Sequence, residues 1–139
     1  MYNSILVTTD FVHDEQTIES LHKAKKLTDN GRIVLLHVVD DIPAYALGEL
    51  PENIIFNITD DQVKHAFKAL KEIAKKAGVA AQVEVRKGRA YSNIIESAKE
   101  LNADLILINS HRPGFSDYLL GSTASKVVRH AQCAVLVDR

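Results

Sequence analysis

A polar segment of small, hydroxyl and basic residues carries the residue types that could do chemistry in this chain. An apolar run from Leu105 to Ile108 leads into it, and it closes at Gly121, Ser122 and Thr123, where an amphipathic stretch begins. Glycine lets the backbone approach an anion closely, free N–H groups at a helix start point toward that anion, and hydroxyls add donors. This succession of buried strand, polar loop and helix start predicts a phosphate cradle, as in nucleotide-binding proteins.

Three side chains of the segment are candidate ligands of the phosphates. Arg112 offers a planar fork of donors suited to phosphate, and Pro113 favours an extended Arg112, which limits where the guanidinium points. Ser110 is expected to donate to a phosphate or a ribose; for Ser110 and Arg112 the alternative is an exposed loop residue. Ser122 has a second interpretation, since a hydroxyl at this position also caps a helix. The two roles of Ser122 are compatible, because an anion binds at the same place.

The histidines and the cysteine give no catalytic or metal-binding pattern. His111 has no serine, aspartate or cysteine partner in a recognisable order, so we expect no catalytic role for it. His37 lies between apolar neighbours in a predicted strand and is expected to be a packed core histidine. The spacing of the histidines fits no metal site. Cys133 begins the last predicted strand and is expected to be a small buried hydrophobic residue.

Strand and helix signals alternate along the chain. Apolar or alternating runs predict strands over residues 4–9, 33–39, 81–86, 104–108 and 134–137. Amphipathic stretches predict helices over residues 14–29, 59–77, 92–101 and 123–130. The second helix begins at a capping box of Thr59 and Gln62 and ends before Gly78. Residues 40–59 form a long irregular segment, which we expect to be functional or mobile.

This order predicts an α/β fold: a doubly wound, open, five-stranded parallel sheet with strand order 3-2-1-4-5, Rossmann-like, with helices on both faces. We expect one domain over residues 1–139. In such folds ligands bind beyond the carboxyl ends of the strands, where the strand order reverses. Asp10 follows the first strand, and the polar segment follows the fourth, so the two are expected to meet. The alternative for Asp10 is a loop-capping aspartate.

Composition excludes several classes of partner. The 139 residues are 46% hydrophobic and 25% charged, with a net charge of −1, which gives no electrostatic footprint for nucleic acid or an anionic membrane. A single cysteine forms no internal disulfide, which fits a reducing compartment. The chain shows neither a signal peptide pattern nor an apolar run of about 20 residues. We therefore expect a cytoplasmic protein with no nucleic-acid or membrane partner.

Several motifs resemble the universal stress protein family over essentially the whole chain. The first strand ends in Asp10, with Thr8 in place of the proline of the family's Pro-x-Asp. Leu36-His37-Val38 in the second strand and Gly88 after the third are also similar to the family pattern. The string from Ser110 to Pro113, followed by Tyr118-Leu-Leu-Gly-Ser122, resembles the enterobacterial UspF/UspG-type branch.

The resemblance implies ATP as the ligand, with Mg²⁺ as a candidate companion. ATP-binding members carry Gly-x-x-Gly, nine residues and then Gly-Ser/Thr, whereas here Asn109 and Arg112 occupy the glycine positions and eight residues precede Gly121. Asp10 is expected on the nucleoside side and Val38 against adenine. The expected binding residues are Thr8, Thr9, Asp10, Val38, Asn109, Ser110, Arg112, Gly121, Ser122 and Thr123.

Three functions remain open from the sequence. The first is an ATP-binding stress-response regulatory protein that holds nucleotide statically or hydrolyses it slowly. The second is a phosphotransferase-type enzyme, against which stand the missing Walker A motif and the missing carboxylate cluster for Mg²⁺. The third is a nucleotide-free dimeric interaction module of the same fold, which the altered glycine positions leave open.

The last strand also predicts self-association. Its apolar residues would lie at an edge of the sheet, where an unpaired backbone invites another strand. We expect a homodimer through residues 134–138, in which Val135 and Val137 face their own counterparts, or a higher oligomer, and similar family members pair at this edge. The alternative is a monomer whose edge is protected by Asp138 and Arg139.

Overall fold

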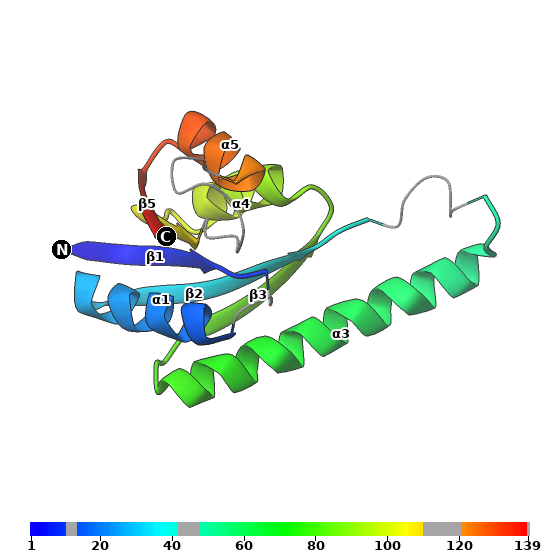
Figure 1. The fold of residues 1–139 in the computed structure, drawn as a ribbon, viewed down its shortest axis with the longest axis horizontal. Coiled ribbons are helices and arrows are strands. Elements are labelled where there is room, and N and C mark those ends of the chain that lie inside the picture. The colour runs from blue at the N-terminus through cyan, green and yellow to red at the C-terminus, as the bar shows by residue number, and fades with distance from the viewer. Residues whose placement is uncertain (11–13, 42–47, 110–120, 139) are drawn as a thin grey trace.

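Five parallel strands form one sheet in the order β3-β2-β1-β4-β5 (Figure 1). The computed structural model describes residues 1–10, 14–41, 48–109 and 121–138. The elements are β1 (Tyr2–Thr8), α1 (Asp14–Leu27), β2 (Thr28–Val39), α3 (Glu52–Ala77), β3 (Gln82–Lys87), α4 (Ala90–Glu100), β4 (Leu105–Asn109), α5 (Ser122–His130) and β5 (Ala134–Asp138). All four strand pairs are parallel. The predicted doubly wound order is thereby confirmed.

Alternation along the central strands divides the core into two layers. Ile5, Val7, Leu35 and Leu107 face α1 and α3, while their neighbours Leu6, Val34, Leu36 and Ile106 face α4 and α5. Successive strand residues point to opposite faces, so strands covered on both faces are apolar throughout. Figure 1 shows α1 and α3 on one side of the sheet and α4 and α5 on the other.

The start of β4 is tied to the start of β1 by one carboxylate. Asp104 accepts hydrogen bonds from the backbone N–H groups of Asn3 (2.8 Å) and Ser4 (3.0 Å). These bonds, the one from Asn3 foremost, hold the pKa of the Asp104 carboxyl below its usual range. Because the two strands are parallel and in register from Ile5 opposite Leu105, their carboxyl ends open at the same edge of the sheet.

Helix α3 begins earlier than the sequence predicted. It starts at Glu52, after Pro51 in an extended conformation, so residues 52–59 of the expected irregular segment are helical. The capping box of Thr59 and Gln62 is therefore wrong: the Thr59 hydroxyl donates to the carbonyl of Ile55 (2.9 Å), one turn back within the helix. The fixed backbone angle of proline suits a helix start, and this signal prevailed over the capping pattern. The predicted end is confirmed, with Gly78 left-handed at φ 68°.

Helix α1 ends at Leu27, two residues before the predicted end, because β2 begins directly at Thr28. Gly31 lies so close to β1 that a β-carbon there would be 2.4 Å from the carbonyl oxygen of Asn3. Only glycine fits this approach without displacement of the backbone. Residues 28–31 thereby join the sheet instead of forming a helix end.

Strand β5 lies at an edge of the sheet, as the sequence predicted. Val135 and Val137, however, pack against the core cluster of α4 and α5 in their own chain. Leu136 points to the opposite face and is 38% exposed. The exposed side chains on β5 are therefore Ala134 and Leu136, while the two valines are half-buried. No helix among the described residues is long and apolar enough to cross a membrane.

Candidate functional site

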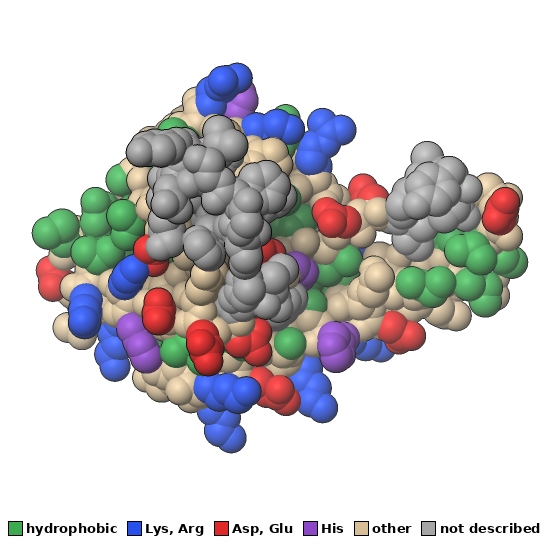
Figure 2. Space-filling model, in the orientation of Figure 1, with side chains coloured by type: hydrophobic (Ala, Val, Ile, Leu, Met, Phe, Trp, Pro, Cys, Tyr) green, Lys and Arg blue, Asp and Glu red, His purple; other side chains and the backbone are tan. Residues whose placement is uncertain are grey.

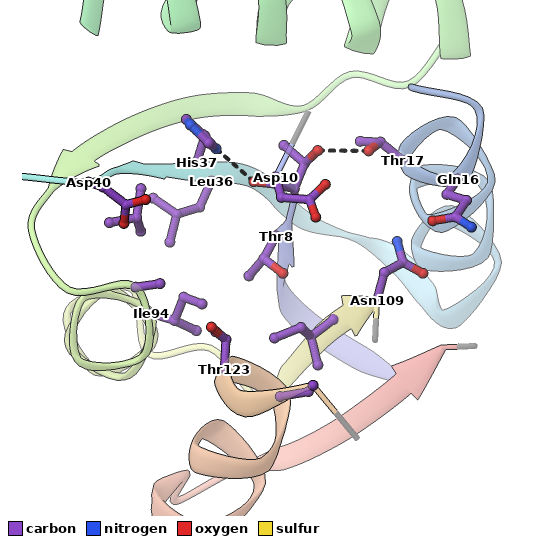
Figure 3. Close-up of a pocket in the computed structure, with 16 residues that line it drawn as sticks. Thr8, Asp10, Gln16, Thr17, Leu36, His37, Asp40, Ile94, Asn109 and Thr123 are labelled. Atoms are coloured by element: carbon purple, nitrogen blue, oxygen red, sulfur yellow. Dashed lines mark hydrogen bonds between the residues drawn. The ribbon is translucent and has the colours of Figure 1, made fainter. Parts of the chain in front are cut away.

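A cavity of about 300 Å³ opens at the carboxyl ends of the central strands (Figure 3). It lies where the chain leaves β1 between its two neighbours, β2 and β4, the reversal point of the strand order. Most of the predicted binding residues line it: Thr8, Thr9, Asp10, Val38, Asn109, Gly121 and Thr123. Ser122 is described but does not line the cavity, and Ser110, His111 and Arg112 lie outside the described residues.

The turn after β1 is held by three hydrogen bonds to Thr9. Its backbone N–H donates to the carbonyl of Leu36 (3.0 Å), its hydroxyl lies 2.8 Å from that of Thr17, and its carbonyl is 2.8 Å from Nδ1 of His37. A carbonyl only accepts, so Nδ1 of His37 carries a proton and donates. Thr9 is thus fixed from β2 and α1 together, and this fixes the position of Asp10, the next residue.

His37 differs from its prediction. The sequence predicted a packed core histidine, whereas the structure places it half-buried in the wall of the cavity. Burial falls from Leu36 to His37 and Val38 and returns at Val39, so β2 is less covered at these two residues. A neighbouring cavity of about 550 Å³ between β2, α1 and α3 shares His37, Val38 and Asp40 with the first. The carboxyl end of β2 therefore forms a wall common to two adjoining hollows.

Asn109 ends β4 with its side chain turned toward α1. Its amide Nδ2 donates to the hydroxyl of Ser20 (2.8 Å), which is fully buried. This side chain links β4 to α1 across the inner wall of the cavity, a contact that a glycine at this position could not make. The link gives Asn109 a structural function in addition to its place in the cavity lining.

The N-terminus of α5 closes another side of the cavity. Gly121 is the N-cap residue, extended at φ −60° and ψ 156°, and no side-chain hydrogen bond caps the helix. The interpretation of Ser122 as the cap is therefore wrong, since Ser122 is the first helical residue. The N–H groups of a first turn have no partner within the helix and carry its positive dipole end. Gly121, Thr123 and Ala124 bring this turn to the cavity, an arrangement suited to an anion.

The charges along the described lining are those of Asp10 and Asp40, with no lysine or arginine among them. Within the described ranges, no group of three or more histidine, cysteine or acidic side chains is placed to hold a metal ion. Positive potential among the described lining residues therefore comes from the start of α5. The cavity is therefore two-ended: a negative carboxylate lies beside β1, and the positive end of a helix dipole lies beside β4.

Five further residues line the cavity without having been expected from the sequence: Gln16, Thr17 and Asp40, and Ala90 and Ile94 of α4. Asp40 follows β2 as Asp10 follows β1, so the rule that sites gather at strand carboxyl ends would have found it. Gln16 and Thr17 come from the first turn of α1, whose approach to the cavity depends on the preceding turn. No sequence signal separated them from other polar residues of that helix.

Cys133 also differs from its prediction. It is half-buried and lines a separate cavity of about 380 Å³ between α4 and the start of β5. Burial raises the pKa of its thiol, and the nearby Asp104 carboxylate adds to the effect. The residue is therefore a partly accessible thiol, not an enclosed core residue.

The strand order and the two-ended cavity at the reversal point define a Rossmann-like α/β protein. The sequence profile of the universal stress protein family matches residues 1–139, and the chain belongs to this family. It is similar to universal stress protein G of Shigella flexneri, with 31% identity over 144 residues that cover 100% of both chains. This similarity agrees with the predicted UspG-type branch.

Solved structures share the fold. UspA from Lactobacillus plantarum has a TM-score of 0.76 at 27% identity, with 99% of this chain and 98% of that one covered. The hypothetical protein MJ0577 has a TM-score of 0.78 at 24% identity, with 99% and 95% covered. Two further proteins of this fold are complexes: a universal stress protein with cAMP (TM-score 0.69, 18% identity, 99% and 97% covered) and one from Archaeoglobus fulgidus with dAMP (TM-score 0.58, 19% identity, 99% and 98% covered).

Proposed function

We propose that this protein is an ATP-binding regulatory protein of the stress response. The observation that carries the proposal is the two-ended cavity, with Asp10 and Val38 at one end and the uncapped start of α5 at the other. A nucleotide has the same polarity, since its base and ribose are neutral donors and acceptors and its phosphates are anionic. The cAMP and dAMP complexes of proteins with this fold support an adenine nucleotide.

The adenosine lies beside Thr8, Thr9 and Asp10, with Val38 against the base. The Asp10 carboxylate accepts hydrogen bonds from ribose hydroxyls or from the adenine amine. The adjoining cavity beside Val38 extends the volume available at this end, and the two volumes lie within the range of small-molecule sites, roughly 300–1,000 Å³.

The phosphates lie at Gly121, Ser122 and Thr123, where backbone N–H groups donate to them. From the sequence, Ser110 and Arg112 add a hydroxyl and a guanidinium, and Asn109 closes the inner wall. Mg²⁺, where present, is held by the phosphates and water, because Mg²⁺ keeps several waters and favours substrate oxygens. The described parts of the chain contain no group of three or more histidine, cysteine or acidic side chains placed to hold a metal ion.

Hydrolysis is at most slow. Phosphoryl-transfer enzymes that turn over at roughly 1–100 s⁻¹ organise metal ligands and a positioned base around the γ-phosphate. The described lining offers Asp10 and Asp40 but no cluster of such ligands. A multiple-turnover assay with ATP and Mg²⁺ is expected to stay below this range. Turnover within it would instead support the phosphotransferase-type enzyme.

The test compares two valine substitutions by isothermal titration with ATP. A β-carbon at Gly121 meets no atom within 4 Å, so Gly121→Val folds but places a branched side chain at the mouth of the cavity. Gly48 is equally unhindered and does not line the cavity, which makes Gly48→Val the matched control. We expect ATP binding to be lost in Gly121→Val and kept in Gly48→Val. Equal affinity of the two variants would refute the placement of the phosphates.

A nucleotide-free interaction module is the second candidate function. The observation in its favour is Asn109, whose side chain occupies a position that ATP-binding members leave to glycine and bonds to Ser20. Chromatography of small molecules released from protein purified without added ligand separates the two functions. Released adenine nucleotide supports ATP binding. A protein that releases no nucleotide and shows no binding in the titration with ATP supports the interaction module.

We also propose a homodimer through residues 134–138. Strand β5 is an edge strand, and an apolar edge pairs readily with a second copy. Leu136→Lys places a charge on the exposed face of this strand without disturbing the valines that pack inward. Sedimentation velocity is expected to show a smaller species for this variant, and an unchanged sedimentation coefficient would refute pairing at this edge.

A further inference from the structure

One side of the proposed nucleotide cavity has apolar walls. Two of these lining residues, Leu36 and Val38, come from β2, and two, Ala90 and Ile94, come from the first turns of α4. Leu36 and Ile94 belong to the same core cluster, and Val38 packs against it, so β2 and α4 meet at this point. Small-molecule sites are apolar along most of their lining and fix the ligand with a few polar groups. These walls therefore suit the planar base of a nucleotide.

Asp40 lies beside these apolar walls. It follows β2 directly, and the backbone N–H of Gly88 donates to the carbonyl of Val39 (2.9 Å), which ties the end of β2 to the turn before α4. Figure 3 shows Asp40 on the same side of the cavity as Ile94, whereas Asp10 lies on the side of α1. The two carboxylates of the described lining are therefore placed at different parts of a bound nucleotide.

The Asp40 carboxylate is available to a ligand. It lines the cavity and is exposed, and it forms no hydrogen bond or ion pair with another of the described residues. Figure 2 shows acidic side chains at the surface beside the point where the chain leaves β2. Asp10, in contrast, already takes part in an interaction within the protein. An ionised carboxylate only accepts hydrogen bonds, so the group that Asp40 meets has to be a donor.

Purine bases differ in the group that they present at C6. Adenine carries an amine there, which donates, whereas hypoxanthine has the same shape and carries an oxygen, which accepts. A carboxylate beside C6 binds the amine and repels the oxygen. A site that hydrogen-bonds a ligand N–H discriminates against an analogue that lacks it, because the partner group is then left unpaired.

We propose that Asp40 determines the base specificity of the site by accepting a hydrogen bond from the exocyclic amine of adenine. The inference rests on the proposed function, and it leaves the ribose hydroxyls to Asp10. The base then lies between β2 and α4, the ribose beside β1 and the phosphates at the start of α5. The alternative for Asp40 is a partner of the positive end of the α4 dipole, which would contribute to stability and not to the choice of base.

Isothermal titration of the full chain with ATP and with inosine triphosphate (ITP) tests the proposal. We expect wild type to bind ATP roughly tenfold tighter than ITP, because a hydrogen bond to a charged group is strong even where solvent weakens it. In Asp40→Asn the amide accepts from adenine and also donates to the oxygen of hypoxanthine, so the two affinities should agree within about twofold. A gain of ITP affinity in this variant cannot come from misfolding.

Asp41→Asn is the matched control. Asp41 is the next residue, is also exposed and lines neither this cavity nor the adjoining one. Its substitution removes the same charge at almost the same place, so a general change in the attraction of triphosphates appears in both variants. We expect Asp41→Asn to keep the wild-type ratio of ATP to ITP affinity.

Purine riboside triphosphate separates the hydrogen bond from repulsion, since it lacks the amine and adds no acceptor at C6. Wild type should bind it more weakly than ATP. In Asp40→Ala the amine has no partner, so the two ligands should bind equally. A larger affinity for ATP that persists in Asp40→Ala would overturn the assignment of the amine to Asp40.

The outcomes also separate this inference from the proposed function. A wild type that binds ATP and ITP equally, an unchanged ratio in Asp40→Asn, or an equal fall of the ratio in Asp41→Asn would overturn the role of Asp40 and leave the ATP site in place. An unchanged ratio with a lower free energy of unfolding in Asp40→Asn would assign Asp40 to the α4 dipole. A wild type that binds none of these nucleotides would overturn the inference together with the proposed function.

Discussion

The hydrogen bond from His37 to the Thr9 carbonyl offers the sharpest test of how the fold positions the site. In His37→Phe an aromatic ring remains but Nδ1 is lost, and with it the 2.8 Å hydrogen bond to the Thr9 carbonyl. Loss of one half-buried hydrogen bond of this kind costs about 1–2 kcal/mol in the free energy of unfolding. The turn does not unravel, because the Thr9 N–H still bonds to Leu36 and its hydroxyl still contacts Thr17.

The loss also reaches the ligand through Asp10, the residue after Thr9. If half of the lost energy must be restored before Asp10 reaches the nucleoside, ATP affinity falls by roughly two- to fivefold. His37→Asn is the matched control, because its side-chain N–H lies close to the position of Nδ1 and can donate to the same carbonyl. Asparagine is expected to recover most of the affinity that phenylalanine loses.

Urea unfolding and isothermal titration of the three proteins check both parts of this prediction. We expect the order wild type, His37→Asn, His37→Phe in unfolding free energy and in ATP affinity. An ATP affinity of His37→Phe equal to that of wild type would refute the positioning of Asp10 by Thr9. An asparagine variant as weak as the phenylalanine variant would show that ring packing, not the hydrogen bond, is what matters.

Three further outcomes follow from local contacts. The folded-state pKa of Asp104 is lowered, so its stabilising contribution is present above the unfolded pKa of about 3.9 and is lost as pH falls through the folded value. In Asp104→Asn the urea midpoint of unfolding should therefore fall less steeply between neutral and low pH than in wild type. An equally steep fall in the two proteins would contradict this. Gly88→Ala should lower the free energy of unfolding by about 1–3 kcal/mol, because φ is +115° there and a β-carbon would lie 3.1 Å from Nδ2 of Asn93; a neutral effect in calorimetry would contradict it. Cys133 should react with iodoacetamide more slowly at pH 8 than a free thiol, because burial raises its pKa, and equal rates would refute this.

The fold was predictable because β1, β2 and β4 are apolar on both faces, which a parallel sheet between helices requires. The strand order followed from the resemblance and from the regular alternation of strands with crossover helices. The start of α3 was not predictable in the same way. Thr59 and Gln62 fit a capping box, and only the continuation of the helix to Pro51 shows that the earlier start prevails.

The site was predictable where it depends on topology and less so where it depends on side-chain direction. The carboxyl ends of parallel strands meet at one edge, so Asp10, Asn109 and Gly121 were placed together from sequence alone. His37 was misjudged because its apolar neighbours indicate a buried strand, while its own exposure depends on where the covering helices end.

The central claim is that an adenine nucleotide binds at the carboxyl ends of β1 and β4. Titration of ¹⁵N-labelled protein with ATP, followed by amide chemical shifts, locates the ligand directly. We expect the largest shifts at Thr9, Asp10 and Val38 and in the first turn of α5 from Ser122 to Ala124, with few at the cavity beside Cys133. An unchanged spectrum at millimolar ATP, or shifts confined to residues outside the cavity, would contradict it.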